Sequence, residues 1–350
     1  MAKVVVAMSG GVDSSVSALL LKKQGFEVIG IHLRLFDNDL IKCCGGNESE
    51  EKFRRICSYI GIKHYVKDAR KIFKENVINN FVKSYISGFT PNPCVECNRF
   101  LKFSYLLEIS NAMGADFLAT GHYAIIRKLD NGFCLERGND LNKDQSYFLY
   151  CIKKENLGKI IFPVGGLLKK DVKKIAEKEG LPLETDNESK DICFIPKGGY
   201  SLFMKRKGYI NSSWGFIRDT LGKIVGRHKG YFNYTIGQRK NLGICAGRRL
   251  YVIDIKPKEN EIVVGEHKDA FKKKIIIKDI NLLSDIKNGS RVMAQIRYRH
   301  IPSAGIIRFG SDVAEFEFDQ PQFALTPGQS CVFYEGNRVL GGGIIYSVVG

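Results

Sequence analysis

The sequence has 350 residues, and its composition of 44% hydrophobic and 26% charged residues excludes collagen-like, low-complexity and disordered chains. No window approaches the ~18 consecutive apolar residues of a membrane helix, and the N-terminal apolar run is too short for a secretory signal, so we expect a cytoplasmic protein without a membrane partner. The 54 Lys and Arg residues against 37 Asp and Glu residues give a net charge of +17, which favours a polyanionic partner such as nucleic acid.

The first part of the chain alternates between strands and helices, as expected for a mostly parallel sheet with helices on both faces. Apolar, β-branched runs predict strands at residues 3–8, 27–33, 63–66 and 117–120. Periodic apolar residues predict helices at residues 14–24, 48–60, 73–86, 102–113 and 171–179. At roughly 100–200 residues per domain, the length predicts two or three domains.

A glycine-rich turn separates the first strand from the first helix, with the sequence Ser9-Gly10-Gly11-Val12-Asp13-Ser14-Ser15. The two glycines allow consecutive N–H groups to point inward, and the N-terminus of the following helix attracts anions. The Lys-Ser/Thr ending of a Walker A loop is absent. The motif is instead similar to the PP-loop signature, whose members use ATP to adenylate a substrate. Asp13 suits this position if it helps to hold Mg²⁺.

Two cysteine segments follow the phosphate loop. Cys94 and Cys97 form a Cys-x-x-Cys pair behind Pro91 and Pro93, a spacing found in zinc, iron–sulfur and redox sites. Cys193 lies between apolar neighbours and by itself suits a buried core thiol. The roles of the adjacent Cys43 and Cys44 stay open, because adjacent cysteines chelate a metal poorly.

Beyond about residue 196 the chain becomes rich in glycine and short β runs, which predicts small barrels or sandwiches. These runs are residues 248–255, 261–265, 274–280, 291–298, 314–318, 330–334 and 343–348. We therefore expect an α/β domain with a parallel sheet at 1–204, a small central β-rich domain at 205–271 and a C-terminal β-barrel at 272–350.

Several motifs occur together in one order along nearly the whole chain. They are the Ser9–Ser15 loop, Asn92-Pro93-Cys94-Val95-Glu96-Cys97-Asn98, Thr120-Gly121-His122-Tyr123, Lys143-Asp144-Gln145-Ser146-Tyr147-Phe148-Leu149, Asp191-Ile192-Cys193-Phe194-Ile195, Tyr234-Thr235-Ile236-Gly237-Gln238-Arg239 and Arg297-Tyr298-Arg299. In this combination the chain resembles the tRNA-specific 2-thiouridylase family, within the PP-loop (adenine nucleotide alpha hydrolase-like) superfamily. Many family members have Asp where this chain has Cys94, so the motif puts the family's nucleophile on Cys97.

The resemblance implies a two-stage reaction at the wobble uridine, uridine 34. ATP adenylates the C2 oxygen, which turns a poor leaving group into AMP, and sulfur from a persulfide on Cys193 then replaces it. Cys97 acts as the second thiol, through a Cys97–Cys193 disulfide that an external reductant restores. Asp13 and Mg²⁺ assist the first stage.

The resemblance also implies the binding residues and partners. ATP-binding residues would be Ala7, Met8, Ser9, Gly10, Gly11, Val12, Asp13, Ser14, Leu33 and Gly121. Residues that contact tRNA or its target base would be Asn92, Pro93, Cys94, Lys143, Asp144, Gln145, Arg297 and Tyr298. The tRNAs would be those for Lys, Glu and Gln, bound at the anticodon stem-loop, and a cysteine desulfurase or sulfur-relay protein would load the persulfide. His122 suits either a general base or a structural role in its loop.

Three alternatives remain open from the sequence. Cys94, Cys97 and Cys193 could hold a [4Fe–4S] cluster that delivers sulfide in the same overall reaction. The chain could be another PP-loop adenylating enzyme with a small-molecule substrate, which leaves Cys97 and Cys193 unexplained. It could also be an iron–sulfur tRNA-binding protein without catalysis.

Overall fold

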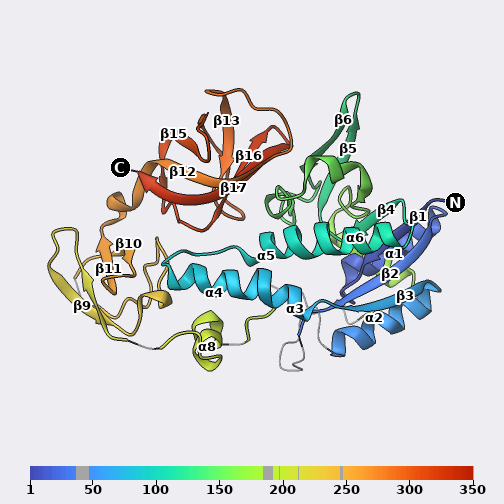
Figure 1. Ribbon diagram of the computed structural model, residues 1–350, viewed down its shortest axis with the longest axis horizontal. Coiled ribbons are helices and arrows are strands. Elements are labelled where there is room, and N and C mark those ends of the chain that lie inside the picture. The colour runs from blue at the N-terminus through green and yellow to red at the C-terminus, as the bar shows by residue number, and fades with distance from the viewer. Residues whose placement is uncertain (37–46, 184–191, 197, 212, 245–246, 350) are drawn as a thin grey trace.

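The computed structural model describes residues 1–36, 47–183, 192–196, 198–211, 213–244 and 247–349. Cys43 and Cys44 therefore lie outside the described residues. Figure 1 shows an α/β part that carries the N-terminus, a β-rich part at the opposite end of the molecule, and a β-barrel that carries the C-terminus.

The N-terminal part is built on a five-stranded parallel sheet of order β3-β2-β1-β4-β7. Its strands are β1 (Lys3–Ala7), β2 (Glu27–Arg34), β3 (Lys63–Asp68), β4 (Phe117–Thr120) and β7 (Ile160–Ile161). The chain leaves β1 toward β2 on one side, whereas β4 pairs on the other side. The strand order thus reverses between β1 and β4. Open α/β sheets bind ligands beside such a point, at the carboxyl ends of the strands.

Helices cover both faces of this sheet, as predicted. They are α1 (Val12–Lys23), α2 (Asn47–Ile60) and α7 (Lys169–Lys178) on one face and α6 (Leu106–Ala112) on the other. The chain also forms α3 (Arg70–Phe73), α4 (Asn79–Ile86), α5 (Pro93–Glu96) and α8 (Gly199–Arg206). Side chains of a strand alternate between faces, so Val4 and Val6 of β1 pack in the apolar cluster of α1 and α2. Val5 packs on the other face, in the cluster of α6.

Two π-helical turns, η1 (Lys74–Ile78) and η2 (Cys97–Tyr105), join these helices. Because of η2, the helical segment that was expected at 102–113 begins at Pro93 instead. Proline suits the first turn of a helix, where its missing N–H needs no partner. Cys94 and Cys97 therefore both lie on helical backbone.

The central part contains a four-stranded sheet of order β10-β11-β8-β9. Its strands are β8 (Gly215–Arg218), β9 (Ile224–His228), β10 (Tyr251–Lys256) and β11 (Glu261–Gly265). Ile217, Val252, Ile262 and Val264 are fully buried and form its own small core. The expectation of a small β-rich domain is confirmed.

The C-terminal part is a barrel of six strands, closed by the pairing of β12 with β17. Its strands are β12 (Phe271–Leu282), β13 (Arg291–Gln295), β14 (Ser303–Phe309), β15 (Ala314–Phe323), β16 (Ser330–Glu335) and β17 (Arg338–Val349). Its apolar core includes Ile275, Phe316 and Phe333. The predicted C-terminal barrel is confirmed.

One hairpin departs from the expected order of elements. Strands β5 (Ala124–Leu129) and β6 (Gly132–Arg137) follow β4 in the chain, but β6 pairs with β17 of the barrel, at Arg338↔Glu136 and Val339↔Leu135. The sequence pattern did not predict that a hairpin of the N-terminal part extends the sheet of the barrel. Within the described residues, we find no helix of the length and apolar character needed to cross a membrane.

Candidate active site

The phosphate loop lies where the ends of β1 and β4 meet. Ala7 and Thr120 are paired at the carboxyl ends of these strands. Gly10 has a φ of +80°, a conformation that glycine adopts at little cost, and Gly11 caps α1. The hydroxyl groups of Ser14 and Ser15 donate to the carbonyl of Gly11, at 3.1 and 2.8 Å. The loop is thus held in shape by its own serines, ahead of a helix N-terminus that attracts anions.

Gly121 packs directly on this loop. A Cβ atom at Gly121 would lie 2.7 Å from the carbonyl carbon of Asp13 and from the nitrogen of Ser14. Real Cβ contacts are essentially never that short, so only glycine fits without moving the loop. The structure therefore brings Gly121 against the predicted ATP loop, although the two are more than 100 positions apart.

Asp13 is held by two side chains from elsewhere in the chain. The Nζ atom of Lys169 donates to both carboxylate oxygens, at 2.6 and 2.8 Å, and the hydroxyl of Tyr123 donates to Oδ1 at 2.7 Å. Lys169 is the first residue of α7 and is 9% exposed. From the sequence it belongs to a run of lysines that indicates only a solvated face, and its burial was not predictable from that pattern.

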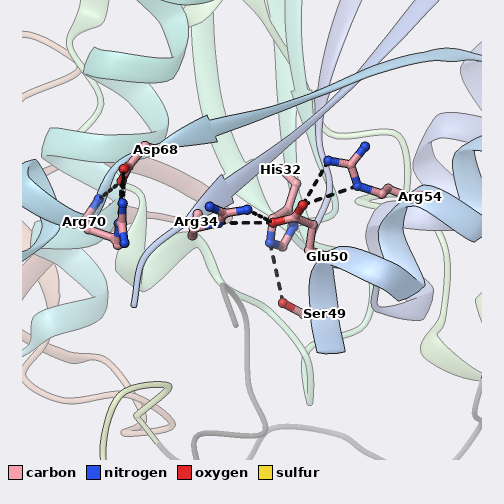
Figure 2. Close-up of polar contacts among 7 residues, drawn as sticks. All are labelled: His32, Arg34, Ser49, Glu50, Arg54, Asp68 and Arg70. Atoms are coloured by element: carbon pink, nitrogen blue, oxygen red, sulfur yellow. Dashed lines mark hydrogen bonds and ion pairs between the residues drawn. The ribbon is translucent and has the colours of Figure 1, made fainter. Parts of the chain in front are cut away.

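His32 and Leu33, the second of which was expected to contact ATP, lie near the end of β2. His32 is buried, stacks on Phe53, and its Nδ1 lies 2.9 Å from the carbonyl oxygen of Met8 in the phosphate loop. Burial lowers its pKa, more strongly than the Met8 carbonyl raises it. Figure 2 shows that its other ring nitrogen faces Ser49, at the start of α2. His32 therefore braces the phosphate loop as a neutral ring.

Figure 2 also shows a charged network at the ends of β2 and β3. Glu50 of α2 accepts from Arg34 of β2 at 2.6 Å and from Arg54 at 2.9 Å. Burial raises the pKa of Glu50, but hydrogen bonds from the two arginines outweigh it, and the net pKa is lowered. Asp68 and Arg70 pair at the end of β3, and this hydrogen bonding holds the pKa of Asp68 at about 2. The network fixes α2 against β2 beside the phosphate loop.

Cys94 is exposed on α5, whereas Cys97 is partly buried at the start of η2. Cys193 is also partly buried, and both Cys97 and Cys193 pack against one apolar cluster that includes Phe73 and Phe194. All three cysteines are thiols in the structure. The two thiols of the expected sulfur-transfer pair thus pack against the same apolar cluster.

Burial raises the pKa of the Cys97 thiol, and the positive charge of Lys102 opposes that rise. Lys102 follows Cys97 by five residues, the hydrogen-bond spacing of a π-helix, so η2 brings a cation to this thiol that α-helical spacing would not. The sequence offered no signal for Lys102, because a π-turn cannot be recognised from apolar periodicity.

His122 lies between Lys102 and Thr120. Its Nε2 is 3.2 Å from Lys102 Nζ and its Nδ1 is 2.7 Å from Thr120 Oγ1. Burial, aided by the charge of Lys102, lowers the His122 pKa well below its usual value. Because an ammonium group only donates, the neutral ring accepts at Nε2 and carries its proton on Nδ1. This geometry favours the structural role of His122 over the general base.

The thiols do not fit the iron–sulfur alternative in this arrangement. Over the described parts of the chain, which include Cys94, Cys97 and Cys193, no three His, Cys, Asp or Glu side chains gather closely enough to hold a metal ion. At Asp13, which was expected to help hold Mg²⁺, the ammonium group of Lys169 already neutralises the carboxylate.

Asn92 and Pro93, the expected target-base segment, line a cavity of about 420 Å³ between α4 and strands β12 and β17 of the barrel. Thr90, two residues before Asn92, bonds to the barrel: its N–H donates to the carbonyl of Pro327 at 2.9 Å. Asn98, on the other side of Cys97, is 2% exposed and donates from Nδ2 to the Phe148 carbonyl at 2.9 Å. The Cys97 segment is thus held from both ends.

The expected tRNA-contacting residues 143–145 have different environments. Asp144 is buried, and its carboxylate accepts four hydrogen bonds, from Arg137, from the N–H of Gly138 and from both the N–H and the hydroxyl of Ser146. Gln145 pairs with the backbone of Tyr123 in both directions, at 2.9 and 3.0 Å. Lys143 is partly exposed. Of these three residues, Asp144 is thus bonded within the protein interior, and the role of Lys143 at tRNA stays a prediction.

Arg297 and Tyr298, at the other end of the predicted tRNA interface, follow β13 of the barrel. The Tyr298 ring packs on Phe148 with 4.7 Å between centroids. The structure therefore brings Tyr298 of the barrel against Phe148, which follows segment 143–145 by three residues in the N-terminal part.

Family models match the chain in three consecutive parts. They are described as the tRNA methyl transferase HUP domain at residues 2–197, the tRNA methyl transferase PRC-barrel domain at 203–266 and the aminomethyltransferase β-barrel domain at 272–345. Curated relatives match the chain almost from end to end. The tRNA-specific 2-thiouridylase of Caldanaerobacter subterraneus subsp. tengcongensis is 43% identical over 98% of this chain and 97% of its own. That of Clostridioides difficile is 43% identical over 98% of each chain.

The two kinds of match carry different names, methyl transfer and thiolation. The thiolation name is the more specific, because it belongs to relatives that share over 40% of their residues along the whole chain. Among solved structures, a U34-tRNA thiolase from Methanococcus maripaludis with its [4Fe–4S] cluster is 21% identical over 55% of this chain and 60% of its own, with a TM-score of 0.35. A likeness this low does not bear on the cofactor of this chain.

Proposed function

Because this chain belongs to the tRNA-specific 2-thiouridylase family, we propose that it replaces the C2 oxygen of uridine 34 in tRNA by sulfur, with AMP and pyrophosphate as the other products. One observation carries the proposal. Segment 120–123 contacts the phosphate loop through Gly121 and Tyr123, and through His122 it contacts Lys102, the cation that acts on Cys97. Segment 120–123 therefore connects the phosphate loop, where the nucleotide would bind, with the surroundings of the Cys97 thiol.

In the first step the phosphate loop, residues 7–14, binds ATP, with Leu33 and Gly121 beside it. The C2 oxygen of the uridine attacks the α-phosphate and pyrophosphate leaves, while loop N–H groups stabilise the developing charge. Asp13 orients Lys169 through their ion pair. Since Asp13 is already neutralised, we propose that Mg²⁺ enters as the counter-ion of ATP.

In the second step Cys193 carries the sulfur as a persulfide. Its terminal sulfur attacks C2 and AMP leaves, and Cys97 then attacks the Cys193 sulfur to release the thiolated base and form a Cys97–Cys193 disulfide. Alternatively, Cys97 attacks first and the released hydrosulfide displaces AMP. Both routes oxidise two thiols, so a dithiol reductant must restore them. The three cysteines do not fit a cluster as they lie, and neither route uses one.

The finer assignments extend the family proposal. The substrates would be the tRNAs for Lys, Glu and Gln, with Asn92, Pro93 and Cys94 at the target base and Lys143, Gln145, Arg297 and Tyr298 along the anticodon stem-loop. A cysteine desulfurase or sulfur-relay protein would load Cys193 in the cytoplasm. The catalytic, central and tRNA-binding domains would divide at residues 204/205 and 271/272.

The test is anaerobic turnover with ATP, Mg²⁺, a persulfide donor and unmodified tRNA for Lys, with 2-thiouridine measured by nucleoside mass spectrometry. We expect Cys97→Ser and Cys193→Ser to abolish product and Cys94→Ser to retain it. Loss in all three variants, together with a dependence on iron, contradicts the two-thiol route in favour of a cluster. No product from the wild-type chain contradicts the function itself.

A further inference from the structure

Arg137 is the last residue of β6, where the hairpin of the N-terminal part pairs with the barrel, and its side chain is 16% exposed. Its guanidinium group makes three contacts in different directions. Nη1 donates to Asp144 at 2.9 Å, Nη2 donates to Gln295 of β13 at 3.0 Å, and the plane lies 3.9 Å from the ring centroid of Tyr334 in β16. One side chain thus joins the N-terminal part to two strands of the barrel.

Each polar partner of Arg137 fixes a segment of the proposed tRNA interface. On one side, Asp144 lies between Lys143 and Gln145, and its other hydrogen bonds come from residues 138 and 146 of the same turn. On the other side, Gln295 accepts from Arg137 at Oε1 and donates from Nε2 to the carbonyl of Arg297 at 3.1 Å. The two segments are therefore linked by a continuous chain of side-chain hydrogen bonds.

The chemistry of this link requires arginine. The planar guanidinium group donates along two fixed directions while its face lies on an aromatic ring, whereas a lysine ammonium group is a point charge that cannot reproduce this fork. Asp144 and Gln295 are 6% and 3% exposed, so water cannot replace a lost partner without opening the contact between the two parts.

We propose that Arg137 is a positioning residue for tRNA: it sets the distance and orientation between segment 143–145 and segment 297–298, so that both contact one anticodon stem-loop. Arg137 does not itself touch the RNA. The inference rests on the proposed function, because it takes tRNA as the ligand of those two segments.

The experiment compares Arg137→Lys and Gln295→Met with the control Arg127→Lys. Arg127 lies on the same hairpin, but it pairs with Glu136 at the exposed surface. For the two test variants we expect the KM for tRNA to rise by about tenfold, with kcat at saturating tRNA and the KM for ATP within about twofold of wild type. The control should match wild type in all three constants.

A second measurement separates positioning from simple loss of stability. A Lys143→Ala/Arg297→Ala background removes the two charged tRNA contacts that Arg137 aligns, so Arg137→Lys should raise the KM for tRNA much less there than in the wild-type background. If Arg137→Lys does not fold, Gln295→Met carries the same comparison, because it keeps the ion pair with Asp144.

Folded variants with a wild-type KM for tRNA, or an equal further loss in the double-alanine background, overturn the inference. A wild-type chain that neither binds nor thiolates tRNA overturns the proposed function instead. The two failures are therefore distinguishable.

Discussion

Lys169 changes the charge that the phosphate loop presents to a nucleotide. A carboxylate at Asp13 would repel ATP, but the buried ammonium group of Lys169 bonds both of its oxygens and makes the pair neutral. Tyr123 adds a third hydrogen bond from the segment that follows β4. Asp13 and Lys169 therefore form a pair without net charge at the proposed ATP site.

Replacing Lys169 by Met should leave Asp13 with an uncompensated charge in the ATP site. We expect tRNA-dependent pyrophosphate release to fall by about 100-fold or more, the scale of losing one preorganised electrostatic contact. The control is Lys170→Met, because Lys170 is exposed and should release pyrophosphate at the wild-type rate. Equal rates for the two variants would show that the ion pair is dispensable.

Cys97 should react slowly as a nucleophile in the resting enzyme. Burial raises its pKa, so the thiol form predominates at pH 7. In a Cys94→Ser background, the alkylation rate of Cys97 by iodoacetamide should rise steadily from pH 7 to 9 without a plateau. Peptide mass spectrometry measures the rate at each pH.

Lys102→Met should slow the alkylation of Cys97 further, because it removes the charge that lowers the thiol pKa. A change of about two- to tenfold at pH 8 is expected for the loss of one nearby charge. Lys71→Met, on the exposed surface of α3, is the matched control. A plateau below pH 9, or no effect of Lys102→Met, would contradict a buried thiol assisted by this cation.

At the scale of elements, the active site depends on how closely the end of β4 approaches the start of α1. The parallel register pairs Thr120 with Ala7, so the two following loops must lie side by side. Gly121 permits this contact because a side chain there would overlap the backbone of Asp13 and Ser14.

Gly121→Ala should therefore displace the phosphate loop while the sheet stays intact. We expect the KM for ATP to rise by about tenfold or more, with little change in the KM for tRNA. Gly166→Ala is a suitable control, because its Cβ would meet only Asn139 Nδ2, at 3.9 Å. Steady-state kinetics with each substrate varied in turn provides the measurement, and an unchanged KM for ATP would argue against the close approach.

At the scale of the whole molecule, the barrel and the N-terminal part are interlocked. The β5–β6 hairpin adds to the edge of β17, and Thr90 donates to the barrel turn at Pro327. Both contacts come from segments that adjoin the site, since Thr90 precedes the Cys94–Cys97 helix and the hairpin ends at Arg137. The barrel therefore supports the segments that carry the proposed catalytic residues.

Acid should destabilise the whole molecule in a defined range of pH. Burial lowers the pKa of His32, His122, His228 and His300. Below pH 6.5 the unfolded chain binds protons at these rings that the folded chain does not, so stability is lost as the pH falls. Glu96 and Asp254, whose pKa values are raised by burial, act in the opposite direction as they take up protons.

We expect the urea midpoint to fall between pH 7 and pH 5, and to fall less steeply in His122→Gln, which removes the ring with the strongly lowered pKa. Unfolding curves at pH 7, 6 and 5 for both proteins test this. A midpoint that is constant for the wild-type chain over this range would contradict neutral buried histidines.

The sequence by itself determined the fold class, the phosphate loop and the family, because strand and helix periodicity, turn glycines and short motifs are local properties of the chain. It assigned β1, α1, β2 and β4 nearly to their observed ends, and it identified the cysteines that the proposal uses. Only the tertiary structure decided which side chains complete the site. Lys169 reaches Asp13 across 156 positions, and Arg137 reaches Gln295 across 158. Such pairs leave no periodic pattern in the sequence, because they form only when distant elements pack together and bury a charged group that needs a hydrogen-bonding partner.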